Sequence, residues 1–285
     1  MHPVLFKIVS FPVPAYGMML ALSFLFGIWI AGLRAKNRGL DPNVISDFGL
    51  YVIVAAVLGS RLYYVFLHFE EFRGNLLAII NPFHGDSIGI GGLVMYGGFI
   101  GAITAGILFF KLKKLPFLPY ADASAPSLGL GIFLTRIGCF LNGCCYGAAA
   151  APGSSCSVDF PAISPAGHYQ QHIHAAGLQP SQLYESAGGL AIALIVFLVG
   201  RRKPFVGLQF YLVGLLYSVL RFMVDFSRVY TETERLGPLS HNQVVCIVLF
   251  IVFGGLILRN YLFRDEPQPA QVKQEETPES TMVQK

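Results

Sequence analysis

Seven stretches of about 20 residues in which apolar side chains dominate constrain this chain more than any other feature. A helix of that length spans a bilayer, and it is the one single-segment structure that satisfies its own backbone hydrogen bonds there. The stretches cover residues 16–33, 48–66, 89–110, 121–141, 183–199, 205–226 and 244–263. We therefore expect an all-α polytopic membrane protein with about seven transmembrane helices.

The composition agrees with a membrane-embedded domain over residues 1–264. Apolar residues make up 54% of the chain and charged residues only 13%, about half the share usual in soluble domains. This excludes a disordered chain and argues against an ordinary cytosolic enzyme. Residues 265–285 are polar, lack an apolar face, and are predicted to be disordered.

Basic residues predict the orientation. Lys and Arg follow the first, third, fifth and last stretches, and the other ends hold fewer of them. Because positively charged loops stay inside, we expect the N-terminus outside and the C-terminus inside. The start of the chain lacks the pattern of a cleaved secretory signal, so the first stretch should be retained. Residues 148–180, between the fourth and fifth stretches, should then form a small extracytoplasmic head.

Charged side chains inside the apolar stretches are candidates for function, because an unpaired charge at the bilayer centre costs at least about 2.5–3.5 kcal/mol. The candidates are Arg61, Arg136, Glu185, Arg221 and Asp225. Three are cationic and two anionic, so a cavity that they lined would suit a phosphate or a carboxylate.

One stripe of the sixth helix should carry Tyr217, Arg221, Asp225 and Arg228, which follow helical spacing. A simpler interpretation is that Arg221 and Asp225 form an i,i+4 ion pair while Arg61 and Arg228 extend toward the outer interface. Both interpretations place the stripe against protein, water or lipid head groups.

Three further motifs complete the candidate site. A turn with Asn142, Gly143 and Gly147 follows Arg136, and its glycines permit close backbone approach. Ser181, Gln182 and Glu185 open the fifth helix, either to bind anionic oxygens or simply to cap it. Gly97 and Gly101 have GxxxG spacing, which is more typical of helix packing than of chemistry, and no nucleotide site is predicted.

The cysteines leave alternatives open. Cys144, Cys145 and Cys156 fall on the predicted outer face, near the head histidines His168, His172 and His174. A disulfide from Cys156 to Cys144 or Cys145 is plausible in an oxidising compartment. The spacings match no ordinary zinc module, so no metal is predicted. Cys139 and Cys246 should be buried apolar residues.

Together these motifs resemble the prolipoprotein diacylglyceryl transferase family over most of residues 12–262. The matching pieces are Tyr16-Gly17, Gly59-Ser60-Arg61, Gly91-Gly92 to Gly97-Gly98, Arg136 through Gly147, Pro180 through Glu185, and Tyr217 with Arg221 through Arg228. The resemblance implies transfer of a diacylglyceryl group from phosphatidylglycerol to the lipobox cysteine of a preprolipoprotein in the bacterial inner membrane. Glycerol phosphate would be released, without a cofactor or a nucleic-acid partner.

The resemblance also implies roles for individual residues. Arg136 and Arg221 would hold the phosphate, Glu185 and Asp225 would orient the arginines, and Tyr96 would lie at the reacting groups. The expected substrate-binding residues are Tyr16, Arg61, Gly97, Gly98, Asn142, Gly143, Gly147, Gln182, Tyr217, Asp225 and Arg228.

Three positions depart from the family pattern. Tyr96 stands where many members have His, Cys139 where many have Asn, and Cys144 where many have Glu. The usual candidate base is therefore missing, and a phosphate oxygen of the lipid could take the thiol proton while Tyr96 donates a hydrogen bond. The alternatives are a lipid-binding paralogue without turnover and an anion transporter. Consumption of phosphatidylglycerol would separate an enzyme from both.

Overall fold

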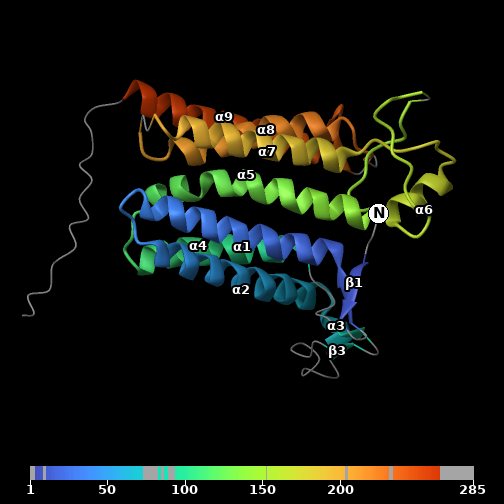
Figure 1. The fold of residues 1–285 in the computed structure, drawn as a ribbon, viewed down its shortest axis with the longest axis horizontal. Coiled ribbons are helices and arrows are strands. Elements are labelled where there is room, and N and C mark those ends of the chain that lie inside the picture. The colour runs from blue at the N-terminus through green and yellow to red at the C-terminus, as the bar shows by residue number, and fades with distance from the viewer. Residues whose placement is uncertain are drawn as a thin grey trace, which may run out of the picture.

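The computed structural model is a bundle of long helices with a small head at one end (Figure 1). It describes residues 4–8, 11–72, 83–84, 87–88, 94–151, 153–202, 205–230 and 234–263. In chain order the elements are β1 (Val4–Ile8), β2 (Phe11–Pro14), α1 (Ala15–Lys36), α2 (Pro42–Leu67), α3 (Phe69–Phe72), β3 (Phe83–His84), β4 (Ser87–Ile88), α4 (Met95–Leu112), α5 (Phe117–Asn142), α6 (Pro165–His172), α7 (Ser181–Val199), α8 (Leu208–Asp225), β5 (Arg235–Leu236), β6 (Leu239–Ser240) and α9 (His241–Leu262).

The predicted all-α membrane fold is confirmed. Helices α1, α2, α5, α7, α8 and α9 are each long and apolar enough to cross a membrane, and α4 is a shorter apolar helix. At 1.5 Å per residue the 18 residues of α4 reach about 27 Å, close to the hydrocarbon thickness. The seven predicted stretches thus correspond to these seven helices, while residues 265–285 lie outside the described residues.

The outer surface of the bundle is apolar, as a lipid-facing surface must be. Trp29, Phe66 and Ile251 are 61%, 77% and 65% exposed. In water, so large an exposed apolar area would drive association, but in a bilayer it contacts acyl chains of similar polarity.

Polar residues cap α2 and α9, which begin earlier than the apolar stretches indicated. Asp41 accepts a hydrogen bond from the Asn43 amide at 2.9 Å, and Pro42 is the first residue of α2. Ser240 and Gln243 form a capping box that starts α9 at His241. Apolar content alone does not detect these polar first turns.

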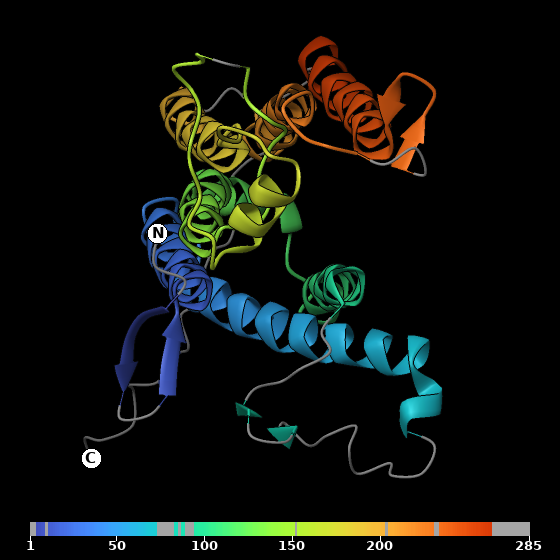
Figure 2. The ribbon, with the colours of Figure 1, turned by 90° about the vertical axis from the view of Figure 1, so that its right-hand side faces the viewer.

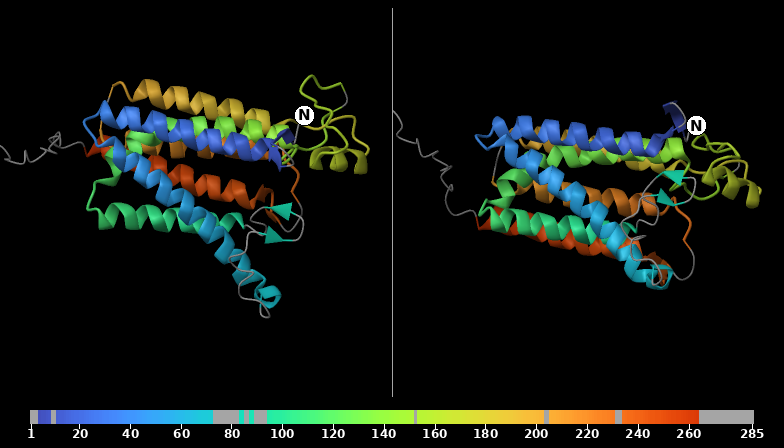
Figure 3. Two further views of the ribbon diagram at one scale, coloured as in Figure 1. Left: turned by 60° about the horizontal axis from the view of Figure 1, so that its bottom comes forward. Right: turned by 90° about the horizontal axis from the view of Figure 1, so that it is seen from below.

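Helix α5 lies at the centre of the bundle, with α1 on one side and α7 on the other (Figures 1 and 2). Helices α2 and α4 pack together as one wing against α1, and α8 and α9 form the opposite wing. Figure 3 shows α2 running obliquely to α1. The two wings therefore flank a central α1–α5–α7 layer.

Glycines set the close approach of α5 to α7. A Cβ atom on Gly129 would lie 2.6 Å from the Ala193 backbone nitrogen, and one on Gly189 would lie 2.8 Å from Ile132 Cγ2. The two helices are antiparallel, and Gly189 of α7 packs against Ile132 of α5. One turn further along each helix, the same register brings Glu185 next to Arg136.

The segment predicted as the head folds over the ends of α5 and α7 (Figure 2). Isolated bridges join Leu178 to Ala149 and to Val158, and Phe160, Ala166 and Leu178 form a small buried core. The head therefore covers the bundle at the end where α5 finishes and α7 begins.

The ends predicted to be cytoplasmic lie together at the opposite end of the bundle (Figure 1). There the buried Asp122 carboxylate accepts hydrogen bonds from the backbone amides of Gly207 and Phe210 at 2.7 and 3.0 Å. Gln209 donates to the Val196 carbonyl at 2.7 Å and accepts from Arg34 at 2.9 Å. This polar cluster, which the sequence analysis did not identify, joins α1, α5, α7 and α8.

Candidate functional site

Glu185 is the centre of the polar network at the head end of the bundle. Its side chain is fully buried on the second turn of α7, and its Oε1 lies 2.8 Å from Arg136 Nη2 of α5. Its Oε2 lies 3.7 Å from Arg221 Nη1 of α8 and 3.4 Å from Arg228 Nη2. Tyr217 of α8 also donates to Oε1, at 3.5 Å. One carboxylate therefore joins three guanidinium groups from separate segments.

Asp225 forms a second, adjoining centre. It pairs with Arg221 Nη2 at 3.0 Å, which confirms the predicted i,i+4 ion pair. It also accepts short hydrogen bonds from the Tyr230 and Ser240 hydroxyls. Burial raises the pKa of the Tyr230 phenol and the hydrogen bond to Asp225 raises it further, so the phenol stays protonated. Asn242 of α9 donates to the same phenol oxygen at 3.1 Å.

The network has an excess of buried cationic donors. Arg136, Arg221 and Arg228 face two carboxylates, those of Glu185 and Asp225. In the described part of the chain, Arg221 Nη1 and Arg228 Nε are buried without a hydrogen-bond partner. Buried donors cost free energy unless they are satisfied, and two such groups on neighbouring guanidiniums suit the oxygens of an anion.

Two details of the predicted stripe and helix start need correction. Helix α8 ends at Asp225, so Arg228 lies in the following turn and approaches Glu185 from there instead of extending toward the interface. Ser181 makes no capping hydrogen bond, because its hydroxyl lies 2.6 Å from the Ser227 hydroxyl. Both differences arise because the chain after α8 folds back onto the start of α7.

The turn after α5 lies beside the network. Gln182 Nε2 donates to the Cys144 carbonyl at 2.8 Å, which ties this turn to α7. Gly143 adopts a φ of 71° and ends α5 directly after Asn142. Gly147 lies so close to its neighbours that a Cβ atom would be 2.4 Å from Ser181 Oγ. The structure thus brings Asn142, Gly143, Gly147 and Gln182 to the same end of α5 and α7. Asn142 and Gly143 follow Arg136 by less than two helical turns.

Tyr16 lies at the same end, on the first turn of α1. Its Cα is 3.3 Å from the position of a Cβ atom on Gly138, so α1 crosses α5 less than one turn from Arg136. Its side chain is 38% exposed. Tyr16 is therefore beside the network but takes no part in the ion pairs described above, and its role in substrate binding stays a prediction.

The α2–α4 wing holds the remaining predicted residues. The Arg61 guanidinium is buried over the rings of Tyr64 and Phe72, with 5.7 and 5.3 Å to their centroids. Tyr96 is 67% exposed on the first turn of α4. Arg61 and Tyr96 therefore belong to a wing that packs on α1. Glu185 and its arginines belong to α5, α7, α8 and the turn that follows α8.

Gly97 and Gly98 have a packing role in this wing. Cβ atoms on them would lie 2.3 Å from the Gly59 carbonyl oxygen and 2.4 Å from Ser60 Oγ. Gly101 packs as closely, since a Cβ atom on it would lie 2.3 Å from the Ala55 carbonyl oxygen, so the expected GxxxG pair of Gly97 and Gly101 is a helix contact. The role of Gly97 and Gly98 in substrate binding stays a prediction.

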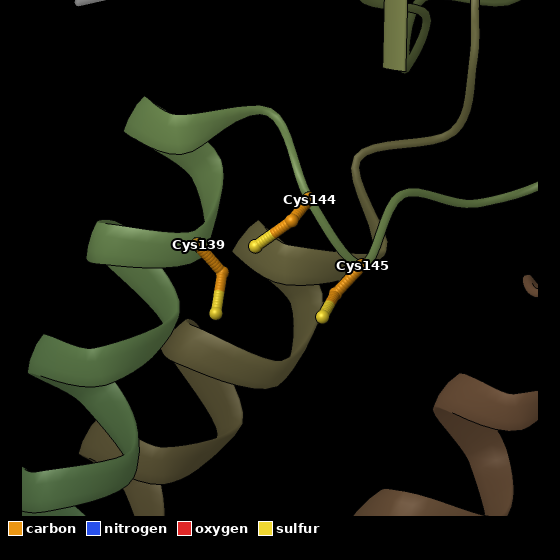
Figure 4. A group of neighbouring side chains, drawn as sticks. All are labelled: Cys139, Cys144 and Cys145. Atoms are coloured by element: carbon orange, nitrogen blue, oxygen red, sulfur yellow. The ribbon is translucent and has the colours of Figure 1, made fainter. Parts of the chain in front are cut away.

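All five cysteines are free thiols, so the alternative of a Cys156 disulfide is not found. Cys139 and Cys246 are buried, as expected. Cys139 is nevertheless more than a core residue, because its sulfur lies with those of Cys144 and Cys145 within 4.8 Å of one another (Figure 4). Cys156, which the sequence places with Cys144 and Cys145, is instead exposed in the head.

Residues around Asp225 were also missed. Tyr230 and Ser240 come from the connection between α8 and α9, and Asn242 follows Ser240 in the capping box. The box is visible in the sequence and would have placed Ser240 at a helix start. Its pairing with Asp225 depends on the path of the connection and has no local signal.

A bundle of membrane-spanning helices that encloses three arginines and two carboxylates beneath a head defines an integral membrane protein equipped to hold an anion. A family model described as prolipoprotein diacylglyceryl transferase matches residues 3–259. The chain therefore belongs to the prolipoprotein diacylglyceryl transferase family, and it is a transferase, as predicted.

Three relatives named phosphatidylglycerol-prolipoprotein diacylglyceryl transferase illustrate the similarity. The protein of Clostridium kluyveri is 32% identical over 90% of this chain and 94% of its own length. The protein of Bacillus cytotoxicus is 31% identical over 85% of this chain and 86% of its own length. That of Listeria monocytogenes serotype 4b is 28% identical over 94% and 92%. The similarity thus covers nearly the whole length of each protein.

Proposed function

We propose that this chain transfers the diacylglyceryl group of phosphatidylglycerol to the lipobox cysteine thiol of preprolipoproteins in the bacterial inner membrane. The thiol sulfur forms a bond to the glyceryl carbon, the carbon–oxygen bond to the phosphate breaks, and glycerol phosphate leaves with that electron pair. The thiol proton is lost. The names of the relatives support the two substrates, and the site supports the chemistry.

The observation that carries the proposal is the excess of buried guanidinium groups around Glu185. Negative charge grows on the departing phosphate, and fixed donors aimed at developing charge stabilise the transition state. Arg136 and Arg221 would hold the phosphate oxygens, while Glu185 and Asp225 keep the guanidiniums in place before lipid enters. Arg228, Gln182 and Tyr217 would complete the contacts to the head group.

A lateral pocket supports access by a lipid. A cavity of about 440 Å³ lies between α7 and α8, with Leu220, Met223 and Phe226 among its lining residues. Leu220 directly precedes Arg221, and Ser227, also in the lining, directly precedes Arg228. An acyl chain in this pocket would lie against the helix that carries Arg221, although the arginines themselves do not line it.

The thiol proton needs an acceptor other than Tyr96, which is 67% exposed on the α2–α4 wing. We assign the proton to a phosphate oxygen of the lipid, with Tyr96 at most donating a hydrogen bond.

The test uses the full chain in detergent micelles with phosphatidylglycerol and a lipobox peptide. Mass gain of the peptide with equimolar release of glycerol phosphate is expected. Arg136→Ala should lower turnover at least about 100-fold, the usual cost of removing one transition-state donor. Arg235→Ala, which removes an exposed arginine at the same end, is the matched control. Binding of the lipid without release from folded protein would instead support a non-catalytic paralogue, and full activity of Arg136→Ala would remove Arg136 from the mechanism.

A further inference from the structure

Three cysteine sulfurs converge where α5 ends. Cys139 lies on the last turn of α5, and Cys144 and Cys145 lie in the turn that follows (Figure 4). The sulfur atoms are all within 4.8 Å of one another. In Figure 4 the three side chains point into one space beside the helices.

The backbone is held in an unusual conformation to achieve this. Gly143 ends α5 with a φ of 71°, which glycine adopts readily, but Cys145 has a φ of 59°, a left-handed conformation that residues other than glycine rarely adopt. The hydrogen bond from Gln182 Nε2 to the Cys144 carbonyl fixes the turn between these two residues. Strained, over-determined backbone of this kind is typical of functional sites.

The sulfur geometry is close to that of a metal site. A tetrahedral zinc ion with bonds of about 2.3 Å holds its sulfur ligands about 3.8 Å apart. Small side-chain rotations would bring the three sulfurs to that spacing. Cys145 is exposed and Cys144 half-buried, so an ion can enter from their side although Cys139 is buried. Among the residues that the structure describes, the group contains three ligands, which leaves one position of a tetrahedral ion open.

The surroundings favour the charge of a loaded site. Three thiolates and a divalent cation carry a net charge of −1. Arg136 Nη1 lies 3.8 Å from Cys139 Sγ, and the adjoining arginines outnumber the carboxylates of Glu185 and Asp225 by one. The arginines would therefore offset part of the negative charge of the loaded cluster.

We propose that Cys139, Cys144 and Cys145 bind one thiophilic divalent cation, zinc above all, with a fourth position that accepts an external thiolate. This second part rests on the proposed function, in which the acceptor is a cysteine thiol. A thiol bound to such an ion loses its proton outright. That proton leaves to a phosphate oxygen when lipid is present and to water when it is absent. The sulfur then forms its bond to the glyceryl carbon, its bond to the metal breaks, and the phosphate takes the electron pair of the carbon–oxygen bond.

Cobalt(II) is a suitable probe for the metal site, because its absorption bands report tetrahedral thiolate coordination. The full chain is kept reduced with a phosphine in detergent and titrated with Co²⁺ in the absence of phosphatidylglycerol. We expect one equivalent to bind and to be displaced by Zn²⁺. Cys145→Ser should weaken binding well over tenfold, because losing even an outer-sphere partner costs roughly 10–100-fold. Cys145 is exposed, so this variant should fold, and size-exclusion profiles check that it does.

Cys156→Ser is the matched control, since Cys156 is an exposed thiol outside the cluster. It should bind Co²⁺ like the unaltered chain. Binding by the unaltered chain that is no tighter than binding by Cys145→Ser would overturn the metal site.

The fourth position has its own readout. A lipobox peptide should shift the Co²⁺ bands, and the same peptide with Ser in place of Cys should not. Identical spectra with both peptides would overturn the external-thiolate position. Because these spectra are recorded without lipid, their failure leaves the transfer reaction untested, and failure of the transfer assay leaves the spectra unaffected.

Discussion

Glu185 balances more buried charge than any other residue described at the candidate site. Arg136, Arg221 and Arg228 reach it from α5, α8 and the turn after α8. Glu185→Gln keeps the shape of the side chain and removes its charge, which leaves three neighbouring cations with one carboxylate. Breaking a buried ion pair in this way typically costs about 3–5 kcal/mol. We expect a much lower thermal unfolding midpoint in micelles and loss of transfer.

Asp47→Asn is the control for a carboxylate in a surface ion pair. Asp47 lies 2.8 Å from Lys113 with half of its side chain exposed, and such pairs contribute little. Its unfolding midpoint should stay close to that of the unaltered chain. If Glu185→Gln unfolds at the same midpoint and keeps full turnover, Glu185 does not balance the arginines.

Tyr96 tests whether this chain has replaced the family's candidate base. General base catalysis is worth roughly 10²–10⁴-fold in rate, so loss of an essential phenol should be obvious. Because Tyr96 is 67% exposed on the α2–α4 wing, we expect Tyr96→Phe to retain a near-normal rate in the transfer assay. A drop of about 100-fold or more in folded protein would return the phenol to the reacting groups.

At the scale of elements, the sequence predicted the seven helices well, because a helix that crosses lipid must be about 20 residues long and mostly apolar. The rule holds even for α5, the weakest stretch, which contains Pro126 and Arg136 yet runs unbroken to Asn142. What the apolar pattern could not supply was the register between helices. It identified Arg136 and Glu185 separately, and only the α5–α7 contact shows that they are partners.

The same limit applies to the cysteine cluster. Cys139 on a helix and Cys145 beyond it come together because Gly143 reverses the chain between them. A helical projection that continued past Asn142 would place Cys145 elsewhere. Turn geometry and tertiary contacts therefore determine this part of the site. Neither of them produces a regular spacing of residues that could be recognised in the sequence.

A substitution at Gly189 would show whether the close contact between α5 and α7 positions the site. In Gly189→Ala the new Cβ would lie 2.8 Å from Ile132 Cγ2 and 2.9 Å from the Phe133 backbone nitrogen, so the helices must separate. Overpacking of this kind costs about 1–3 kcal/mol. Since Arg136 and Glu185 lie one turn away, we expect both the unfolding midpoint and the transfer rate to fall.

Gly255→Ala is the matched control for that variant. Gly255 also lies within a long helix, α9, and a Cβ there meets no described atom within 4 Å. Alanine is the better helix former by about 1 kcal/mol, so this variant should be neutral or slightly stabilising and fully active. A transfer rate for Gly189→Ala equal to that of Gly255→Ala would show that the site tolerates movement of these helices.

At the scale of the whole molecule, polar clusters tie the bundle together at both ends, and the cluster at the head end has the buried arginines that suit an anion. At the end opposite the head, Asp122 bonds the amides of Gly207 and Phe210, and Gln209 extends the cluster to α1 and α7. Fourteen residues of α5 separate Asp122 from Arg136, about 21 Å along the helix. The Asp122 cluster therefore lies far from the residues that we propose to act on substrate.

Asp122→Asn should separate stability from catalysis. The amide keeps one acceptor oxygen, so one of the two backbone amides loses its partner, at a cost of about 1–3 kcal/mol. We expect a lower unfolding midpoint, but an unchanged kcat and KM at temperatures where the variant is folded, because the arginine network lies at the other end. Circular dichroism in micelles and the transfer assay measure the two quantities on one sample. A fall in kcat without loss of folded protein would show that the two ends of the bundle are mechanically coupled.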